Sequence, residues 1–195
     1  MAGGNTHKQS ERGSARTVRR PPEIAAPVLL ERAIFAGGRF WGLQSLLRRY
    51  PNVVGTRAGY AGGEKLWPTH QDIGSHAEAV EVVFGAEKPG YRRLLEFFFQ
   101  IHDPTTWHRQ GDDIGSRYRS AVFFTTKLQM RVSADTIAAI DACGLWPGPV
   151  VTQIVAAARF WEAEPEHQDY FDRHPSAHKF HFVRPGWILP PRRGG

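Results

Sequence analysis

Cysteine is almost absent from this sequence: Cys143 is the only one among 195 residues. No disulfide can form within the chain, and metal sites that need several cysteines are excluded. Long apolar runs are also missing, since none approaches the ~20 residues that a helix needs to span a bilayer. The first residues lack the apolar stretch of a secretory signal. We therefore expect a cytoplasmic protein that does not enter a membrane.

Acidic residues are outnumbered by basic ones, 19 against 25, which gives a formal net charge of +6. Much of the excess lies near the two ends of the chain, as in Arg19, Arg20, Arg192 and Arg193. Such a distribution is typical of solvated extremities and does not favour nucleic-acid binding. The charge therefore says little about function.

Composition divides the chain into three segments. Residues 1–27 are rich in Gly, Ser and Arg and predict a disordered leader. Residues 28–187 contain the apolar patterns of one domain, and we expect a monomer. Residues 188–195 are rich in Pro and Arg and predict a tail or a packed arm.

Within the domain, apolar spacings of two and of three to four residues alternate along the chain. They predict a mixed α+β fold, with a long loop over residues 102–120. The expected strands are 32–36, 53–63, 76–84, 118–126 and 150–157. The expected helices are 40–50, 91–102, 128–143 and 164–174, the third of them closed by Gly144.

Glu78 is the first candidate for chemistry. Alternation along the strand places it on the face of Val80, Val82 and Phe84. A carboxyl group on an apolar face has a raised pKa and can act as a general acid. The same pattern also suits a glutamate at a strand end that reaches solvent or an arginine.

The segment GGRFWG, at the expected junction of a strand and a helix, is the second candidate. Glycines there allow close approach of the backbone, and the first helical amides point outward, which suits a polarised oxygen. Phe40 and Trp41 would then form the wall of a pocket. Alternatively, both rings simply pack the helix onto the sheet.

Other clusters are weaker. Asp112, Asp113, Arg117 and Tyr118 in the long loop either serve a site or are ordinary loop polarity. Three histidines near the C-terminus could share a helical face, but no carboxylate or cysteine completes a metal site; they are His174, His178 and His181. Cys143, at a helix end, is expected to be a small packed side chain and not a reactive thiol.

Six blocks together resemble, in order and spacing, the A-type peptide methionine-S-sulfoxide reductases. They are GGRFWG, GYAGG, HAEAVEVVF, FFFQIHDPTT, RQGDDIGSRYRSAVFF and WEAEPEHQDYF. The C-terminal HFVRPGW resembles the actinobacterial branch of that family. The resemblance implies an α+β two-layer sandwich with a mixed β-sheet core in a ferredoxin-like arrangement with long loops. It further implies repair of oxidised methionine without metal or organic cofactor, with electrons from thioredoxin.

The resemblance also assigns roles to residues. In the family, a cysteine at the first turn of the helix attacks the sulfoxide sulfur while a glutamate protonates the oxygen, and a second cysteine resolves the sulfenic acid. Phe40 and Trp41 match the methyl-binding wall and Glu78 the acid. Asp113 and Tyr118 match polar residues that hold the sulfoxide, and His70 stands where the family has a further tyrosine.

Two departures from the pattern concern the thiols. Arg39 stands at the nucleophile position, and Phe180 stands at the position of the resolving cysteine. A guanidinium stays protonated and has no lone pair to offer sulfur, so Arg39 cannot replace a thiolate. A cation at a helix N-terminus is also opposed by the helix dipole.

Three functional hypotheses follow from these departures. The chain is a reductase by descent whose chemistry is disabled, or a module that binds methionine sulfoxide or another small polar ligand without turnover. A reductase that uses Cys143 is the third. In addition, we predict an ion pair between Arg39 and Glu78 that lowers the pKa of Glu78; the alternative is that Arg39 turns outward to solvent.

Overall fold

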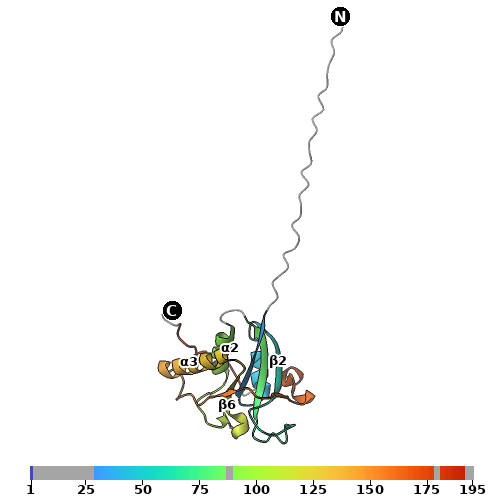
Figure 1. Ribbon diagram of the computed structural model, residues 1–195, viewed down its shortest axis with the longest axis vertical. Helices are drawn as coiled ribbons and strands as arrows, with labels where there is room; N and C mark the ends of the chain where they lie inside the picture. Colours follow the sequence, from blue (N-terminus) through green and yellow to red (C-terminus); the bar gives the residue numbers. More distant parts are fainter. Residues whose placement is uncertain (2–28, 87–89, 178–180, 192–195) are drawn as a thin grey trace.

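The computed structural model describes Met1 and residues 29–86, 90–177 and 181–191. Apart from Met1, the predicted leader 1–27 lies outside the described residues, as do His178, Phe180 and the arginines near the two ends. The described chain forms one six-stranded sheet with its main helices on one face, and a separate two-stranded ribbon (Figure 1). Within these residues, no helix is both long and apolar enough to cross a bilayer.

The sheet has the strand order β7-β6-β1-β3-β2-β8. Its strands are β1 (Leu30–Gly37), β2 (Val53–Ala61), β3 (Ala77–Gly85), β6 (Ser120–Phe124), β7 (Gln153–Ala156) and β8 (Trp161–Glu162). Only β6 and β7 run parallel, and every other neighbouring pair is antiparallel. The sheet is therefore mixed, as the sequence predicts.

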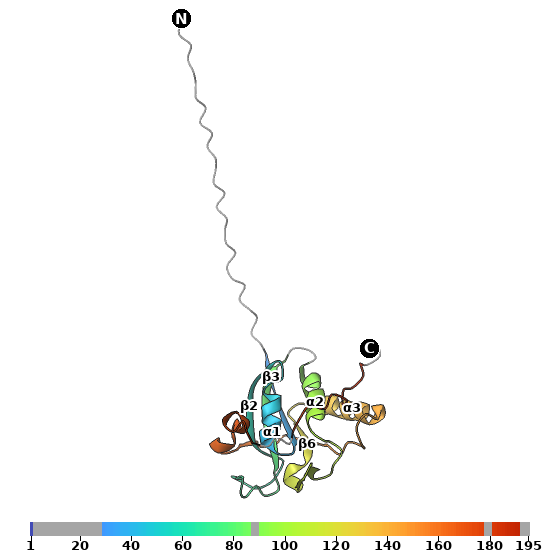
Figure 2. The same ribbon diagram turned by 180° about the vertical axis from the view of Figure 1, so that it is seen from behind.

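Three helices pack on one face of the sheet: α1 (Phe40–Leu47), α2 (Gly90–Ile101) and α3 (Lys127–Cys143). Figure 2 shows α1 against β2 and β3, with α2 beside it. Thr126 caps α3 by accepting a hydrogen bond from the Gln129 N–H, and Gly144 ends the helix in the left-handed conformation. These helices and strands confirm the elements predicted from apolar spacing.

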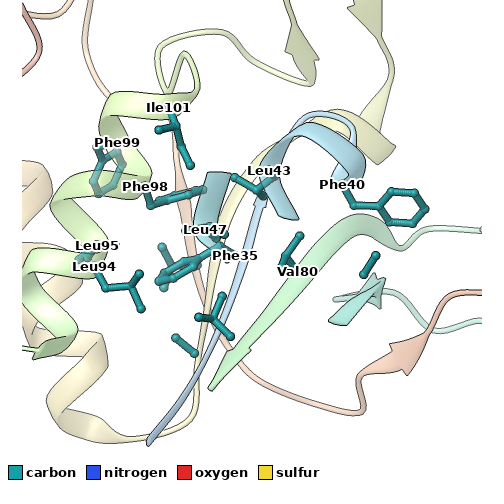
Figure 3. Packing of buried hydrophobic residues seen from close by; sticks show 14 of the residues in the cluster. Phe35, Phe40, Leu43, Leu47, Val80, Leu94, Leu95, Phe98, Phe99 and Ile101 are labelled. Carbon is teal, nitrogen blue, oxygen red and sulfur yellow. The ribbon is translucent and has the colours of Figure 1, made fainter. Parts of the chain in front are cut away.

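The core lies between the sheet and the helices. Phe35 on β1 stacks on Phe98 of α2, with 4.7 Å between ring centroids, and Leu43 and Leu47 of α1 close the same space (Figure 3). These residues are almost completely buried, and burying such a side chain stabilises the fold by about 1.5–3 kcal/mol. The packing fixes α1 against β3, which positions the N-terminus of α1 beside Glu78.

Two expectations about the elements are corrected. The long loop contains a two-stranded ribbon, β4 (Arg109–Gln110) with β5 (Asp113–Ile114), and a 3₁₀ turn η1 (Ser116–Tyr118), so β6 starts only at Ser120. The single helix expected over 164–174 is divided into a 3₁₀ turn η2 (Pro165–His167) and α4 (Tyr170–Arg173). The interruption has a cause: the side chain of Gln168, whose backbone is extended, pairs with the backbone of Ala58 on β2.

Candidate functional site

The junction between β1 and α1 is a tight turn that depends on glycine. Gly38 has a φ of 96°, a conformation that other residues rarely adopt. A Cβ at this position would lie 2.5 Å from the Gln110 side chain. The turn leaves Arg39 at the N-cap of α1, with an extended backbone and no side-chain capping bond. The structure thus places Arg39 at the helix end, where the sequence predicts it.

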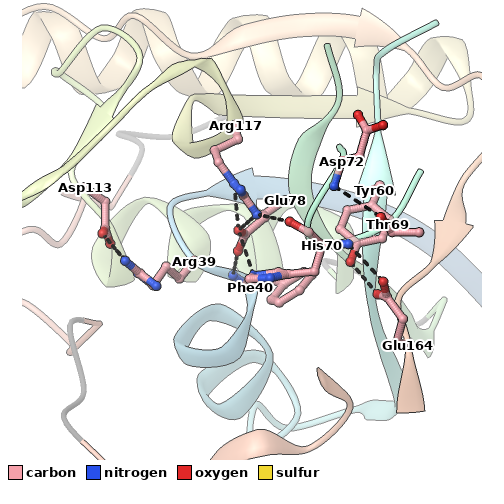
Figure 4. A network of polar contacts seen from close by, with 10 residues as sticks. All are labelled: Arg39, Phe40, Tyr60, Thr69, His70, Asp72, Glu78, Asp113, Arg117 and Glu164. Atoms are coloured by element: carbon pink, nitrogen blue, oxygen red, sulfur yellow. Dashed lines mark hydrogen bonds and ion pairs between the residues drawn. The ribbon is translucent and has the colours of Figure 1, made fainter. Parts of the chain in front are cut away.

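Glu78 lies on β3 next to that helix end. Its Oε2 accepts the Phe40 N–H at 3.1 Å, and its Oε1 accepts Nε and Nη2 of Arg117 at 3.1 and 2.8 Å (Figure 4). Only 1% of the side chain is exposed. Val80, Val82 and Phe84 lie in the core on the same face, so the predicted face is confirmed. The carboxylate is nevertheless covered, and Arg117 is its cationic partner.

The acidity of Glu78 results from opposing effects. Burial raises its pKa above the ordinary value, and this effect outweighs the Phe40 N–H and the Arg117 charge, which both lower the pKa. The raised pKa that the apolar face of the strand predicts is therefore confirmed. A cationic partner lowers the pKa, as predicted, but does not reverse the effect of burial.

Arg39 does not form the predicted ion pair with Glu78. Its Nε and Nη2 instead donate to Oδ2 and Oδ1 of Asp113, at 2.8 and 2.6 Å. Asp113 lies on β5, so the ribbon of the long loop provides the carboxylate. Figure 4 shows this pair separate from the pair of Glu78 and Arg117. Arg117 already pairs with Glu78, and Arg39 pairs with the carboxylate of the ribbon instead.

The Tyr118 ring is close to both guanidinium groups. Its ring centroid is 5.5 Å from the Arg39 guanidinium carbon and 5.4 Å from that of Arg117. Both distances allow cation–π attraction. Arg39 and Arg117 remain partly exposed, with 31% and 25% of their side chains accessible. The site therefore presents hydrogen-bond donors on an aromatic support.

Aromatic rings form a wall beside these cations. Trp41 stacks on Tyr170 of α4 at 4.3 Å between centroids and on His70 at 5.7 Å. Phe40 is completely buried behind them and contacts His70 and His167. A cavity of about 210 Å³ opens next to Arg39 and Trp41, and Tyr170 and His181 also line it. Phe40 thus has the packing role that the sequence offered as the alternative, whereas Trp41 lines the cavity.

His70 is held in place through its backbone. Its N–H donates to Oε1 of Glu164 at 2.9 Å, and the Tyr60 hydroxyl donates to Oε2 of the same carboxylate at 2.6 Å. Burial lowers the pKa of His70, and the neighbouring His167 and Arg117 lower it further. The ring is thus neutral near pH 7. Its Nε2 lies 3.7 Å from Glu78 Oε1.

The structure brings together the seven residues that the resemblance assigns to this site: Arg39, Phe40, Trp41, His70, Glu78, Asp113 and Tyr118. It adds four that sequence reasoning did not assign: Tyr60, Glu164, His167 and Tyr170. The signal for Glu164 was present, because it belongs to one of the six matching blocks, but its contact with a loop about 90 residues earlier has no pattern in the sequence. Asp112 is exposed and has no part in the site.

Two other candidates lie elsewhere or serve the fold. Cys143 ends α3, where its thiol donates to the Ile140 carbonyl and lines a cavity with Arg92 and Glu96. None of the residues of the candidate site lines that cavity. His181 is buried, with Nε2 donating to the Gly37 carbonyl at 2.7 Å. Among the described residues, no group of three potential ligands could hold a metal ion.

Comparison with known proteins decides the family. The family model described as "Peptide methionine sulfoxide reductase" matches residues 31–186. The chain belongs to the peptide methionine sulfoxide reductase family. A relative of this family, MsrA from the actinobacterium Nocardia farcinica, is 59% identical over 162 residues, which are 83% of this chain and 95% of the relative.

Solved structures have a similar fold. Methionine sulfoxide reductase A of Corynebacterium diphtheriae is 30% identical, with a TM-score of 0.68 over 79% of each chain. Reduced Mxr1 from Saccharomyces cerevisiae is 30% identical, with a TM-score of 0.74 over 80% of this chain and 92% of that one. Mxr1 in complex with Trx2 is 26% identical, with a TM-score of 0.55 over 86% of this chain and 96% of that one. The α+β fold with a mixed sheet is thus that of methionine sulfoxide reductases.

Proposed function

We propose that this family member binds the methionine sulfoxide of oxidised peptides and does not reduce it. The observation that carries the proposal is the placement of Arg39. Its guanidinium stands at the helix end where the resemblance assigns the reacting thiol, and two hydrogen bonds to Asp113 hold it there. A guanidinium cannot attack sulfur. Glu78, the proposed acid, is covered at the same time by Arg117.

The same groups suit a sulfoxide as a ligand. Its oxygen is a strong hydrogen-bond acceptor, and partly exposed Arg39 and Arg117 are donors beside it. Its methyl group and apolar stem fit the cavity next to Trp41. In this proposal Trp41 and His70 form the wall with Phe40 packed behind them, Asp113 orients Arg39, and Tyr118 supports both cations. A disabled reductase and a binding module are then two descriptions of one site.

Further details of the resemblance enter the proposal in the same way. We assign the arrangement β1-α1-β2-β3-α2-β6, with the order β6-β1-β3-β2, to a ferredoxin-like core. Thioredoxin would be needed only to reduce a disulfide, and the site has no thiol in the described residues. We therefore expect no turnover in its presence.

Titration of the full chain with N-acetyl-methionine-S-sulfoxide amide tests the proposal. We expect saturable quenching of tryptophan fluorescence, and binding at least about tenfold weaker for the unoxidised methionine amide, because only the sulfoxide has a strong acceptor. A Trp41→Ala variant should lose the binding. Trp107→Ala is the matched control, since Trp107 is exposed and contacts only His108 among the described aromatic residues.

A thioredoxin-coupled assay completes the test. We expect no conversion of the sulfoxide peptide to its reduced form above the level without protein. Equal binding of the oxidised and unoxidised amides would reject the proposed ligand. Catalytic formation of the reduced peptide would reject the absence of reduction and would require a thiol from elsewhere in the chain.

A further inference from the structure

A stack of three side chains lies on the surface at the β8 edge of the sheet. The Arg159 guanidinium carbon lies 4.1 Å from the centroid of the Trp161 ring and 5.4 Å from that of Trp67. The two tryptophans meet edge to face at 4.8 Å. We call these three residues the Arg159 stack. Trp161 is buried, whereas Trp67 and its neighbour Leu66 are 71% and 70% exposed.

Arg159, the cation of the stack, differs from Arg57 in its ion pairs. Arg57 forms ion pairs with Glu81 and Glu162, which neutralise it. Within the described residues, Arg159 has no carboxylate within 4.0 Å. A guanidinium that stacks on rings keeps its edge free for hydrogen bonds and loses little freedom on binding, so it suits a carboxylate ligand.

The backbone of Trp67 indicates that its exposure has a use. Its φ is 55°, a conformation that is strained for a bulky residue. The strain presents a large apolar ring to water, where it contributes little to the core. Strain of this kind persists where the surrounding structure enforces it, and it is enriched in binding segments. In this conformation the Trp67 ring contacts Trp161.

The stack is also close to the candidate site. Trp67 precedes His70 by three residues and Trp161 precedes Glu164 by three, and the two segments meet at the hydrogen bond from His70 N–H to Glu164. Three residues span at most about 11 Å. The His70 ring in turn contacts Trp41. A peptide bound at the wall would thus reach the stack with about three extended residues.

We propose that the Arg159 stack binds an acidic side chain, about three residues from the methionine sulfoxide, in the oxidised peptides that this protein recognises. The inference rests on the proposed function, because it takes the sulfoxide site as the anchor. It adds a sequence preference: the guanidinium pairs with a glutamate or aspartate, and Trp67 covers the apolar part of that side chain. Peptides with lysine at this position should be disfavoured by charge repulsion.

Short peptides with one central methionine-S-sulfoxide test the preference on the full chain. One set carries Glu three residues before or after the sulfoxide, and the matched set carries Gln. We expect the Glu peptide to bind about five- to tenfold more tightly in one of the two positions at low salt. High salt should reduce the difference, because exposed charges are screened.

Variants assign the effect to the stack. Arg159→Gln should abolish the preference for Glu, and Arg159→Lys should restore part of it, since the charge returns without the planar fork. Trp67→Ala should weaken the preference with the charge unchanged. Arg131→Gln is the matched control: Arg131 is exposed on α3, and the variant removes the same charge elsewhere.

The possible results separate the inference from the proposed function. Equal binding of Glu and Gln peptides in both positions, or a preference that survives Arg159→Gln, overturns the inference while sulfoxide binding still supports the proposed function. A Glu preference that is equal in unoxidised peptides supports the stack and rejects the proposed function. If no sulfoxide peptide binds, both are wrong.

Discussion

Gly42 shows how closely a single residue of α1 is constrained. A Cβ built on it lies 2.4 Å from Nδ1 of the buried His181 ring. We expect Gly42→Ala to displace that ring from the Gly37 carbonyl and to lower the free energy of unfolding by about 1–3 kcal/mol. Urea denaturation measures the change.

The matched control is Gly55→Ala on β2, where a Cβ would meet nothing within 4 Å. This variant should be neutral or slightly stabilising, because Ala has less conformational freedom than Gly in the unfolded chain. An equal loss of stability in both variants would contradict the contact between Gly42 and His181 as the cause.

The Arg39→Cys variant tests whether a thiol at this position restores the first step of reduction. A thiolate there can bond to the sulfoxide sulfur while Glu78 protonates the oxygen, which releases methionine and leaves a sulfenic acid. We expect a burst of about one methionine per chain without sustained turnover, since no resolving thiol follows. Quenched-flow analysis of methionine measures it. Arg39→Ser should give no burst, and the absence of a burst in Arg39→Cys would mean that Arg117 keeps Glu78 out of reach.

Contacts between individual side chains of the site were the features that the sequence predicted least completely. It identified Arg39, Glu78 and Asp113 as site residues, and the structure brings all three together. It paired Arg39 with the wrong carboxylate, because a choice between Asp113 and Glu78 depends on where the long loop folds back. No local pattern encodes the position of Arg117 over Glu78.

Among the elements, the segment after β8 depends on one side chain. Gln168 accepts the Ala58 N–H at 2.8 Å and donates to the Ala58 and Ala163 carbonyls at 2.9 and 3.0 Å. We expect Gln168→Ala to destabilise the protein by about 1–3 kcal/mol, because backbone groups lose their partners. Hydrogen exchange should show faster exchange at the Ala58 amide.

Gln71→Ala provides the control for that prediction, since Gln71 is exposed. Stability and exchange at Ala58 should not change in this variant. Unchanged exchange at Ala58 in Gln168→Ala would show that water or a backbone shift replaces the glutamine.

Element prediction succeeded where the apolar period is long. The pattern of α2, with Leu94, Leu95 and Phe98 inward, and the alternation of β3 both match the structure. It failed between residues 164 and 174, where a helical pattern is present but Gln168 gains more from pairing with β2 than from continuing the helix. β8 was missed because two residues are too few for a period.

At the scale of the whole molecule, stability should depend on pH through two buried histidines. Burial lowers the pKa of His102 to about 3 and that of His181 to about 4. Both are neutral in the folded protein and take up protons on unfolding. Their contribution to stability is therefore complete above pH ~6.5 and is lost as the pH falls toward these values.

The contribution of Glu78 to stability has the opposite pH dependence, because the pKa of Glu78 is raised in the fold. This contribution is complete below the ordinary pKa of a glutamate and is lost as the pH rises. Since two histidines oppose one glutamate, the net effect below pH ~6.5 is that acid destabilises the protein. Thermal unfolding between neutral and acidic pH measures the slope. His102→Gln should make it shallower, and an unchanged slope in His102→Gln would show that other groups control acid unfolding.

The amide of Gln168 has a consequence for how copies of this protein behave toward one another. It forms the hydrogen bonds that a further strand would form at Ala58, at the point where β8 ends. β8 does not cover β2 at Ala58, and there the side chain of Gln168 takes the place of a strand from another molecule. Edge-to-edge pairing is a common start of aggregation. A single glutamine therefore protects the backbone of Ala58 against such pairing.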